Sequence, residues 1–232
     1  MTPPHIGTLT EQSLHADLKQ WLARPGDQLE VPLDGYVIDV LRGDLLLEVQ
    51  TRHLYALKPK LRKLLRKHTV QLFHPIAAAR WIVRQDRAGK RIGRRKSPKK
   101  GQVVEIFKEL VRMTPLLDHP RLTVSVLLVH EEQIWRDDGQ GSWRRRRWSI
   151  VDRRLLSVEE RHDFQGAAAW LQLLPPDLPQ PFTNRDLASG LGCRLELARQ
   201  ASYTLRKLAL VEVVGKQGNA HQMRVVGLLA NS

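Results

Sequence analysis

The sequence predicts an α/β chain of the α+β kind, with a mixed sheet flanked by helices and then a smaller unit of helices and one hairpin. Runs rich in Val, Ile and Leu, bounded by turn residues, predict strands, and apolar residues spaced three and four apart predict helices. The 232 residues are enough for one large or two small domains. A hydrophobic content of 42% is sufficient for ordinary cores.

The first half of the chain alternates between helix and strand signals. Leu14, Leu18, Trp21 and Leu22 recur at helical spacing and form one apolar stripe. The dipeptide Gly43-Asp44 separates two apolar runs, which is the signal of a tight hairpin. The predicted helices span residues 8–23, 57–68 and 102–113. The predicted strands span residues 29–31, 35–41, 45–51, 70–76, 80–85, 122–135 and 143–151, and a basic loop is predicted at 87–101.

The C-terminal part predicts helices followed by a hairpin. The pattern Ser157-Val-Glu-Glu160 resembles a helix start. Thr183, with Asp186 three residues later, caps a short helix, and a glycine-containing turn follows. The longer helix is predicted at 194–209, and the strands of the hairpin at 210–214 and 221–226. We therefore predict a first domain at residues 1–137, a basic hairpin or connector at 138–154, and a second domain at 155–232.

The order of these C-terminal elements resembles a winged helix-turn-helix domain. On the longer helix, Arg199, Tyr203 and Arg206 lie opposite the apolar stripe, and Lys216 lies in the wing. Side chains in these positions contact base edges and phosphates in a DNA major groove. Winged helices also serve for protein contacts, so that alternative stays open.

The net charge of +14 is concentrated in one stretch of the chain. Residues 58–100 contain 16 lysines and arginines but one acid, Asp86, whereas the rest of the chain is close to neutral. A localised excess of this kind points to a polyanionic partner. A solvated face and an anionic membrane surface are the alternatives, although nothing resembles a lipid anchor. The basic residues of this stretch expected to contact nucleic acid are Lys58, Lys60, Lys63, Lys67, Arg94 and Arg95.

A second basic cluster occupies residues 143–148, where four arginines stand between two tryptophans. Alternation along a strand would place Trp143, Arg145 and Arg147 on one face. Arginine and aromatic side chains together grip phosphates and stack on bases. The same arginines could instead form an interdomain contact with the neighbouring acids, which are Asp137, Asp138 and Asp152.

Two acids are expected to meet across the predicted hairpin. If Gly43-Asp44 forms the loop, Asp39 pairs with Glu48, and side chains directly across a ladder share a face. Two carboxylates about 4 Å apart repel by roughly 4 kcal/mol at an effective dielectric of about 20. A divalent cation removes that penalty, and all-oxygen ligation suits Mg²⁺. The alternative is a solvated sheet edge where Arg52 or Lys19 neutralises one acid, and a one-residue slip would separate the pair.

Glu11 extends the inward stripe of the first predicted helix, where an acid needs a partner. The segment Thr8-Leu-Thr-Glu11 also fits a capping box, in which Glu11 would bond the helix start. The two roles are compatible, and both stay open.

A helix bearing Glu11, followed by Asp39 and by Glu48-Val-Gln50 on adjacent strands, resembles the PD-(D/E)XK nuclease superfamily. The pattern looks most like its Holliday-junction-resolvase and restriction-endonuclease branches, and it covers about residues 7–76, with weaker cover to about 135. The resemblance implies a restriction-endonuclease-like core in which Asp39, Glu48 and Glu11 hold Mg²⁺ or Mn²⁺. It places Gln50 where a lysine usually orients the attacking water. Glutamine positions a water by hydrogen bonds but supplies no positive charge.

These observations predict a metal-dependent endonuclease that hydrolyses DNA phosphodiester bonds, in DNA repair, recombination or defence. The alternative is a non-catalytic DNA-binding protein or transcriptional regulator with a decayed nuclease core, and a third option is a scaffold for a protein partner. A homodimer is a further option, because many relatives of this core dimerise. No signal peptide or apolar run of membrane-spanning length is visible, and the single cysteine, Cys193, suits a reducing compartment. We therefore expect a cytoplasmic protein without a membrane partner.

Overall fold

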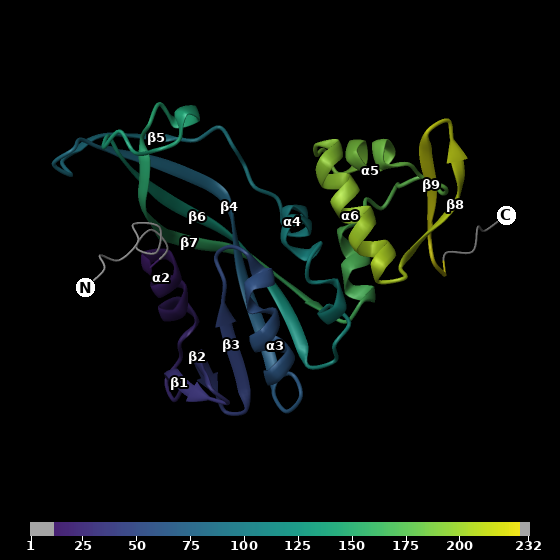
Figure 1. Cartoon of the computed structure of the whole chain (residues 1–232), viewed down its shortest axis with the longest axis horizontal. Helices are drawn as coiled ribbons and strands as arrows, with labels where there is room; N and C mark the ends of the chain where they lie inside the picture. The colour runs from purple at the N-terminus through teal and green to yellow at the C-terminus, as the bar shows by residue number, and fades with distance from the viewer. Residues whose placement is uncertain (1–11, 228–232) are drawn as a thin grey trace. The chain divides into compact units, whose positions relative to one another are not determined.

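The computed structural model of this chain describes residues 12–227. A 7-stranded sheet, a separate 2-stranded sheet and several flanking helices confirm the predicted α+β class (Figure 1). The described residues form two compact units. One comprises residues 12–51, 72–102 and 126–162, and the other comprises 52–71, 103–125 and 163–227. No helix within residues 12–227 is both long enough and apolar enough to cross a bilayer.

The large sheet is mixed. Its strand order is β1-β2-β3-β4-β6-β7, with β5 paired to β4. Val70 donates a backbone hydrogen bond to Arg121 at one end of β4 and β6, and Asp137 donates one to Gln85 at the other end, so these two strands are parallel. The strands are β1 (Gln28–Leu33), β2 (Tyr36–Arg42), β3 (Leu45–Val49), β4 (Thr69–Gln85), β5 (Arg91–Lys96), β6 (Leu122–Arg136) and β7 (Ser149–Gln165).

The hairpin of β2 and β3 has the predicted register. Arg42 pairs with Leu45 and Val40 pairs with Leu47, in an antiparallel ladder closed by the Gly43-Asp44 loop. Gly43 has a φ of 55°, a left-handed conformation that costs glycine little. The local turn signal therefore determines which side chains of β2 and β3 share a face.

Helix α2 (Gln12–Leu22) packs against β2 and β3 in the first unit (Figure 1). Its buried face consists of Leu14, Leu18 and Leu22, whereas Trp21 is 45% exposed and lies outside the predicted stripe. The three leucines join a core cluster with Val40, Leu47, Val49, Phe73, Leu127 and Val129. Burying each leucine contributes roughly 1.5 to 3 kcal/mol, so this face holds α2 on the hairpin.

The second unit contains short helices and the C-terminal hairpin. Phe164 and Trp170 stack with their ring centroids 4.5 Å apart, and Phe107 packs beside Trp170 at 6.4 Å. The predicted capping box at Thr183 and Asp186 is confirmed. The elements are η1 (Leu54–Leu57), α3 (Lys58–Leu64), η2 (Val103–Ile106), α4 (Phe107–Leu110), η3 (Thr114–Leu116), η5 (Ala168–Leu173), α5 (Asn184–Gly190), α6 (Leu195–Lys207), β8 (Val211–Gln217) and β9 (Ala220–Val225).

The helix predicted to start at Ser157 is wrong, because residues 149–165 form β7. Polar side chains of this strand find partners on β6: Ser125 donates to Asp163 at 2.6 Å, and His130 lies 3.2 Å from Glu159. These long-range contacts outweigh a local pattern that suits a helix start. Residue 155, where the second domain was predicted to begin, lies inside this strand.

Three other local expectations also change. Residues 91–96 of the predicted basic loop form β5, because Arg94 and Lys96 lie over the Trp81 ring of β4, at 5.1 and 5.0 Å from its centroid. The two strands predicted at 70–76 and 80–85 are one continuous strand, β4. The helix predicted at 102–113 is reduced to η2 and the four-residue α4.

Candidate functional site

Asp39 sits where β2 and β3 leave their regular ladder. The observed ladder ends at the pair of Val40 and Leu47, one pair short of the predicted pair of Asp39 and Glu48. Asp39 uses its side chain there: its Oδ2 accepts a hydrogen bond from the Val49 backbone N–H at 2.8 Å. This bond fixes the carboxylate against β3, and 14% of the side chain remains exposed to solvent.

Residues of α2 and β1 complete the surroundings of Asp39. His15 Nε2 lies 3.3 Å from Asp39 Oδ2 and 3.1 Å from the Val49 carbonyl oxygen. Lys19 was one of the residues expected to neutralise an acid of the pair. It donates instead to Glu30 at 2.6 Å, and this bond holds the pKa of Glu30 below its ordinary value, while the charge of Asp39 opposes that shift.

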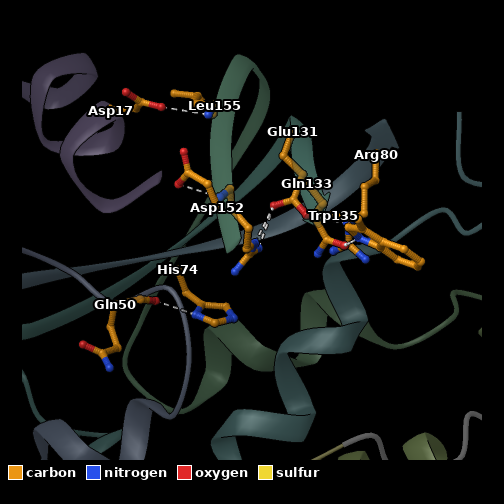
Figure 2. Close-up of polar contacts among 10 residues, drawn as sticks. Asp17, Gln50, His74, Arg80, Glu131, Gln133, Trp135, Asp152 and Leu155 are labelled. Carbon is orange, nitrogen blue, oxygen red and sulfur yellow. Dashed lines mark hydrogen bonds and ion pairs between the residues drawn. The ribbon is translucent and has the colours of Figure 1, made fainter. Parts of the chain in front are cut away.

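Glu48 and Gln50 are held on β3 and directly after it. Glu48 is buried, with 2% of its surface exposed. The Gln50 backbone N–H donates to the Phe73 carbonyl at 2.9 Å, and its own carbonyl oxygen lies 2.8 Å from His74 Nδ1. Figure 2 shows the Gln50 amide side chain pointing away from His74. The main chain at Gln50 is therefore hydrogen-bonded to β4, and its side chain points away from His74.

The third predicted ligand, Glu11, lies outside the described residues. Among residues 12–227 there is no group of three His, Cys, Asp or Glu side chains that could hold a metal ion. A site made from Asp39, Glu48 and Glu11 is therefore still a prediction.

The predicted nucleic-acid contacts of the second unit are largely at the surface. On and just after α3, Lys63 and Lys67 are exposed and Lys58 and Lys60 are half-buried, because Leu61 and Leu64 form the inner face. Helix α6 likewise buries Ala198, Ala201 and Leu205. The side chains predicted to face outward from α6 and the wing are all exposed; these are Arg199, Tyr203, Arg206 and Lys216.

In the first unit, Arg94 and Arg95 are neighbours on β5 with different surroundings. Arg94 donates to Glu132 of β6 at 2.6 Å and lies over Trp81. Arg95 forms no ion pair with a described residue and instead lines a cavity of about 470 Å³. We call this the arginine–tryptophan cavity. Its lining consists of Arg84, Arg95, Trp135, Arg144, Arg145, Arg146 and Trp148.

The arginine–tryptophan cavity is formed by β4, β5, the end of β6 and the segment before β7. That segment is not the strand on which Trp143, Arg145 and Arg147 were predicted to share a face, because residues 143–145 form η4 and Trp143 is 79% exposed. Of the residues that line the cavity, the sequence had singled out Arg95, Arg144, Arg145, Arg146 and Trp148. It missed Arg84 and Trp135, which no local pattern links to them.

Two of the three acids expected to pair with these arginines are engaged elsewhere. Asp138 accepts from the Gln140 backbone N–H at 3.0 Å and from Ser149 Oγ at 2.8 Å. Asp152 accepts from the Arg153 backbone N–H at 2.8 Å and pairs with Arg154 at 3.1 Å. Within residues 12–227, neither aspartate forms an ion pair with residues 144–147, so neither neutralises the positive charge of these four arginines.

A buried charge network, also missed from the sequence, lies on β4, β6 and β7 (Figure 2). The Glu131 side chain is fully buried between Arg80, at 2.5 Å, and Arg153, at 2.6 Å. The only sign of this network in the sequence was a charged residue inside the apolar run of β6. With both oxygens bonded to guanidinium groups, the network has the features of a structural ion-pair cluster.

Comparison with known proteins identifies a family and one curated relative. An uncharacterized protein of Treponema pallidum (strain Nichols) is 37% identical over 196 residues, which cover 83% of this chain and 78% of that protein. No solved structure matches the chain. The model of the family described as "Domain of unknown function (DUF8091)" matches residues 12–165, a span that includes Asp39, Glu48 and all residues of the arginine–tryptophan cavity. The chain therefore belongs to the DUF8091 family.

Proposed function

We propose that this protein binds DNA, and that the arginine–tryptophan cavity is a principal contact. The observation that carries the proposal is the set of five arginines around one cavity, none of which pairs with a carboxylate among the described residues. Arginines left without acidic partners hold a positive potential at the surface, and such a potential attracts the phosphate backbone. Exposed Lys63, Lys67 and Arg206 of the second unit favour the same class of partner.

This proposal is tested by fluorescence anisotropy with labelled DNA at several salt concentrations. Wild-type protein should bind, with an affinity that falls steeply as salt rises, because counterions are released on binding. Arg84→Gln and Arg95→Gln should each weaken binding. Arg154→Gln is the matched control: it removes one exposed arginine of the same unit, 61% exposed and paired with Asp152. Equal losses in all three variants, or no binding by the wild type, would refute the proposed contact.

Metal-dependent DNA cleavage is the second candidate, and the position of Asp39 favours it. The chain order helix, three antiparallel strands, helix, strand (α2-β1-β2-β3-α3-β4) is compatible with the PD-(D/E)XK resemblance, and Asp39 accepts a hydrogen bond from Val49, the residue after Glu48. The donor chemistry fits a hard cation, because both side chains are carboxylates and Asp39 reaches solvent. Asp39 and Glu48 would hold Mg²⁺ or Mn²⁺, with Glu11 as the third ligand.

The bound ion would lower the pKa of a water and stabilise charge on the scissile phosphate. The chain's own contribution is orientation. The Val49 N–H holds the Asp39 carboxylate in place, and His15 lies beside the same oxygen, so the acid needs little rearrangement. Gln50 would orient a water by hydrogen bonding without adding charge.

A nuclease assay over duplex, branched and single-stranded DNA decides this second candidate. Cleavage should require Mg²⁺ or Mn²⁺ and stop with EDTA. Asp39→Asn should abolish it while keeping an oxygen that accepts from Val49, whereas Asp44→Asn, in the exposed hairpin loop, should cleave like the wild type. If the wild type cleaves nothing, or if Asp39→Asn cleaves equally well, the hydrolase function is refuted. DNA binding is judged separately by the anisotropy measurements.

A further inference from the structure

We infer that the arginine–tryptophan cavity takes an unpaired nucleotide, so that the protein prefers DNA with a single-stranded segment. This inference rests on the proposed DNA binding and adds to it the class of DNA that is recognised. The cavity combines positive charge with flat aromatic and guanidinium surfaces, and these two features match a phosphate and an unstacked base.

The phosphate-binding side of the cavity comes from a tightly folded turn. Arg146 and Arg147 both have left-handed backbones, with φ of 49° and 64°. The Gly141 N–H donates to the Arg147 carbonyl at 2.8 Å, and Arg145 Nε donates to the Trp148 carbonyl at 3.2 Å. A Cβ added at Gly141 would lie 1.8 Å from the Trp148 carbonyl oxygen, so the turn closes only around a glycine. It therefore presents Arg144, Arg145 and Arg146 from a defined backbone.

The base-binding side comes from two tryptophans and an arginine. The Arg84 guanidinium lies over the Trp148 ring, 5.3 Å from its centroid, and Trp148 is only partly buried. On β6, Trp135 donates its indole N–H to Gln133 at 3.2 Å, which fixes the orientation of its ring (Figure 2). Bases stack on aromatic rings and on guanidinium planes alike, so all three side chains can receive a base.

Size and stacking favour an unpaired nucleotide over duplex DNA. A volume of about 470 Å³ lies within the range of about 300 to 1,000 Å³ typical of small-ligand sites, which suits one nucleotide and not a double helix. Bases in a duplex already stack on their neighbours and pair with the other strand. Entry into the cavity is therefore least costly for a base that is already single-stranded or unpaired.

The test measures binding of the full chain to matched DNA probes by fluorescence anisotropy. The probes are a single strand, the duplex of the same sequence, and the single strand with abasic sites in place of several bases. The single strand should bind more tightly than the duplex. Removing the bases should cost roughly 5- to 150-fold for each stacked base that is lost, which corresponds to typical stacking contributions.

Two pairs of like residues from the same segment give matched variants. Trp148→Leu should lose the preference for the intact over the abasic strand, whereas Trp143→Leu should keep it, because Trp143 flanks the same arginine run but does not line the cavity. Arg146→Gln should weaken binding of every probe, whereas Arg147→Gln, which shares its left-handed backbone but does not line the cavity, should not. Circular dichroism identifies any variant that fails to fold, and the wild-type comparison of intact and abasic strands then tests the stacking role.

The outcomes separate this inference from DNA binding itself. Equal affinity for duplex, single and abasic strands would refute the stacking role and leave DNA binding in place. If a free deoxynucleoside monophosphate competes with the strand at equal molar concentration, the cavity is a site for free nucleotides, and its role in selecting single-stranded DNA is refuted. No binding to any probe would refute both proposals.

Discussion

Arg153 donates from both Nη2 and Nε to the same oxygen of Glu131, at 2.6 and 3.2 Å, and the Glu131 side chain is fully buried. The other carboxylate oxygen accepts from Arg80 Nε at 2.5 Å. One acid on β6 thus joins β4 on one side and β7 on the other. The Arg153 side chain is only 6% exposed, so neither member of this pair can return its charge to water without opening the sheet.

Glu131→Gln should destabilise the protein by about 3 to 5 kcal/mol, because it leaves the buried Arg153 charge uncompensated. Urea unfolding of wild type and variant measures the difference. Glu132→Gln is the neighbouring control: Glu132 is 22% exposed in its pair with Arg94, and its loss should cost about 1 kcal/mol or less. Equal losses at the two positions would show that burial of Glu131 carries no special cost.

The ion pair of Asp27 and Arg42 should make stability depend on acid pH. Arg42 donates to Asp27 at 2.7 Å, which holds the pKa of this carboxyl below its ordinary value of 3.8. A lowered pKa in the folded state contributes stability above the ordinary value, and that contribution is lost as the pH falls through the lowered one. Asp27→Asn should therefore be less stable than wild type at neutral pH.

The difference between Asp27→Asn and wild type should shrink as the pH falls below about 4 and vanish under more acidic conditions. Unfolding midpoints from pH 2 to 7 check this, with Asp44→Asn as a control on an exposed aspartate of the same unit. A difference that stays constant over the whole range would mean that the Arg42 contact does not depend on the carboxylate charge.

Thr183→Ala should cost about 0.5 to 2 kcal/mol by removing the cap of α5. Thr183 Oγ1 accepts from the Arg185 N–H at 3.2 Å and from the Asp186 N–H at 3.4 Å, and Asp186 Oδ2 accepts from the Thr183 N–H at 2.7 Å. Thr183→Ser keeps the hydroxyl and should retain most of the stability. A serine variant as unstable as the alanine variant would assign the loss to the missing methyl group, because Thr183 is 94% buried and packed.

Features with short-range signals could be predicted from the sequence. The Gly43-Asp44 loop determined the register that pairs Arg42 with Leu45 and Val40 with Leu47, and the Thr183 capping box marked the start of α5. The leucine stripe of α2 and the inner face of α6 followed from helical spacing. In each case the residues that decide the structure lie within about one or two turns of each other.

Features made by distant segments could not be predicted. Glu131 meets Arg80 and Arg153 only because β4, β6 and β7 are neighbours, and nothing near Glu131 in the sequence reports that order. Likewise Arg84 and Trp135 enter the arginine–tryptophan cavity through the parallel alignment of β4 and β6. The wrong prediction of a helix at Ser157 has the same explanation. The partners that hold β7 as a strand come from β6, which is distant in the sequence.

Salt dependence should distinguish a contact made inside the cavity from a general effect of charge. Each phosphate neutralised by a basic side chain adds about 0.7 to the slope of log affinity against log salt for single strands. Arg146→Gln should therefore reduce this slope by about 0.7, whereas Arg147→Gln should leave it unchanged, since the net charge lost is the same in both variants. Anisotropy titrations over a salt series measure both slopes. If the two variants reduce the slope equally, the phosphates are bound along the whole arginine run, and the position of Arg146 in the cavity has no particular role.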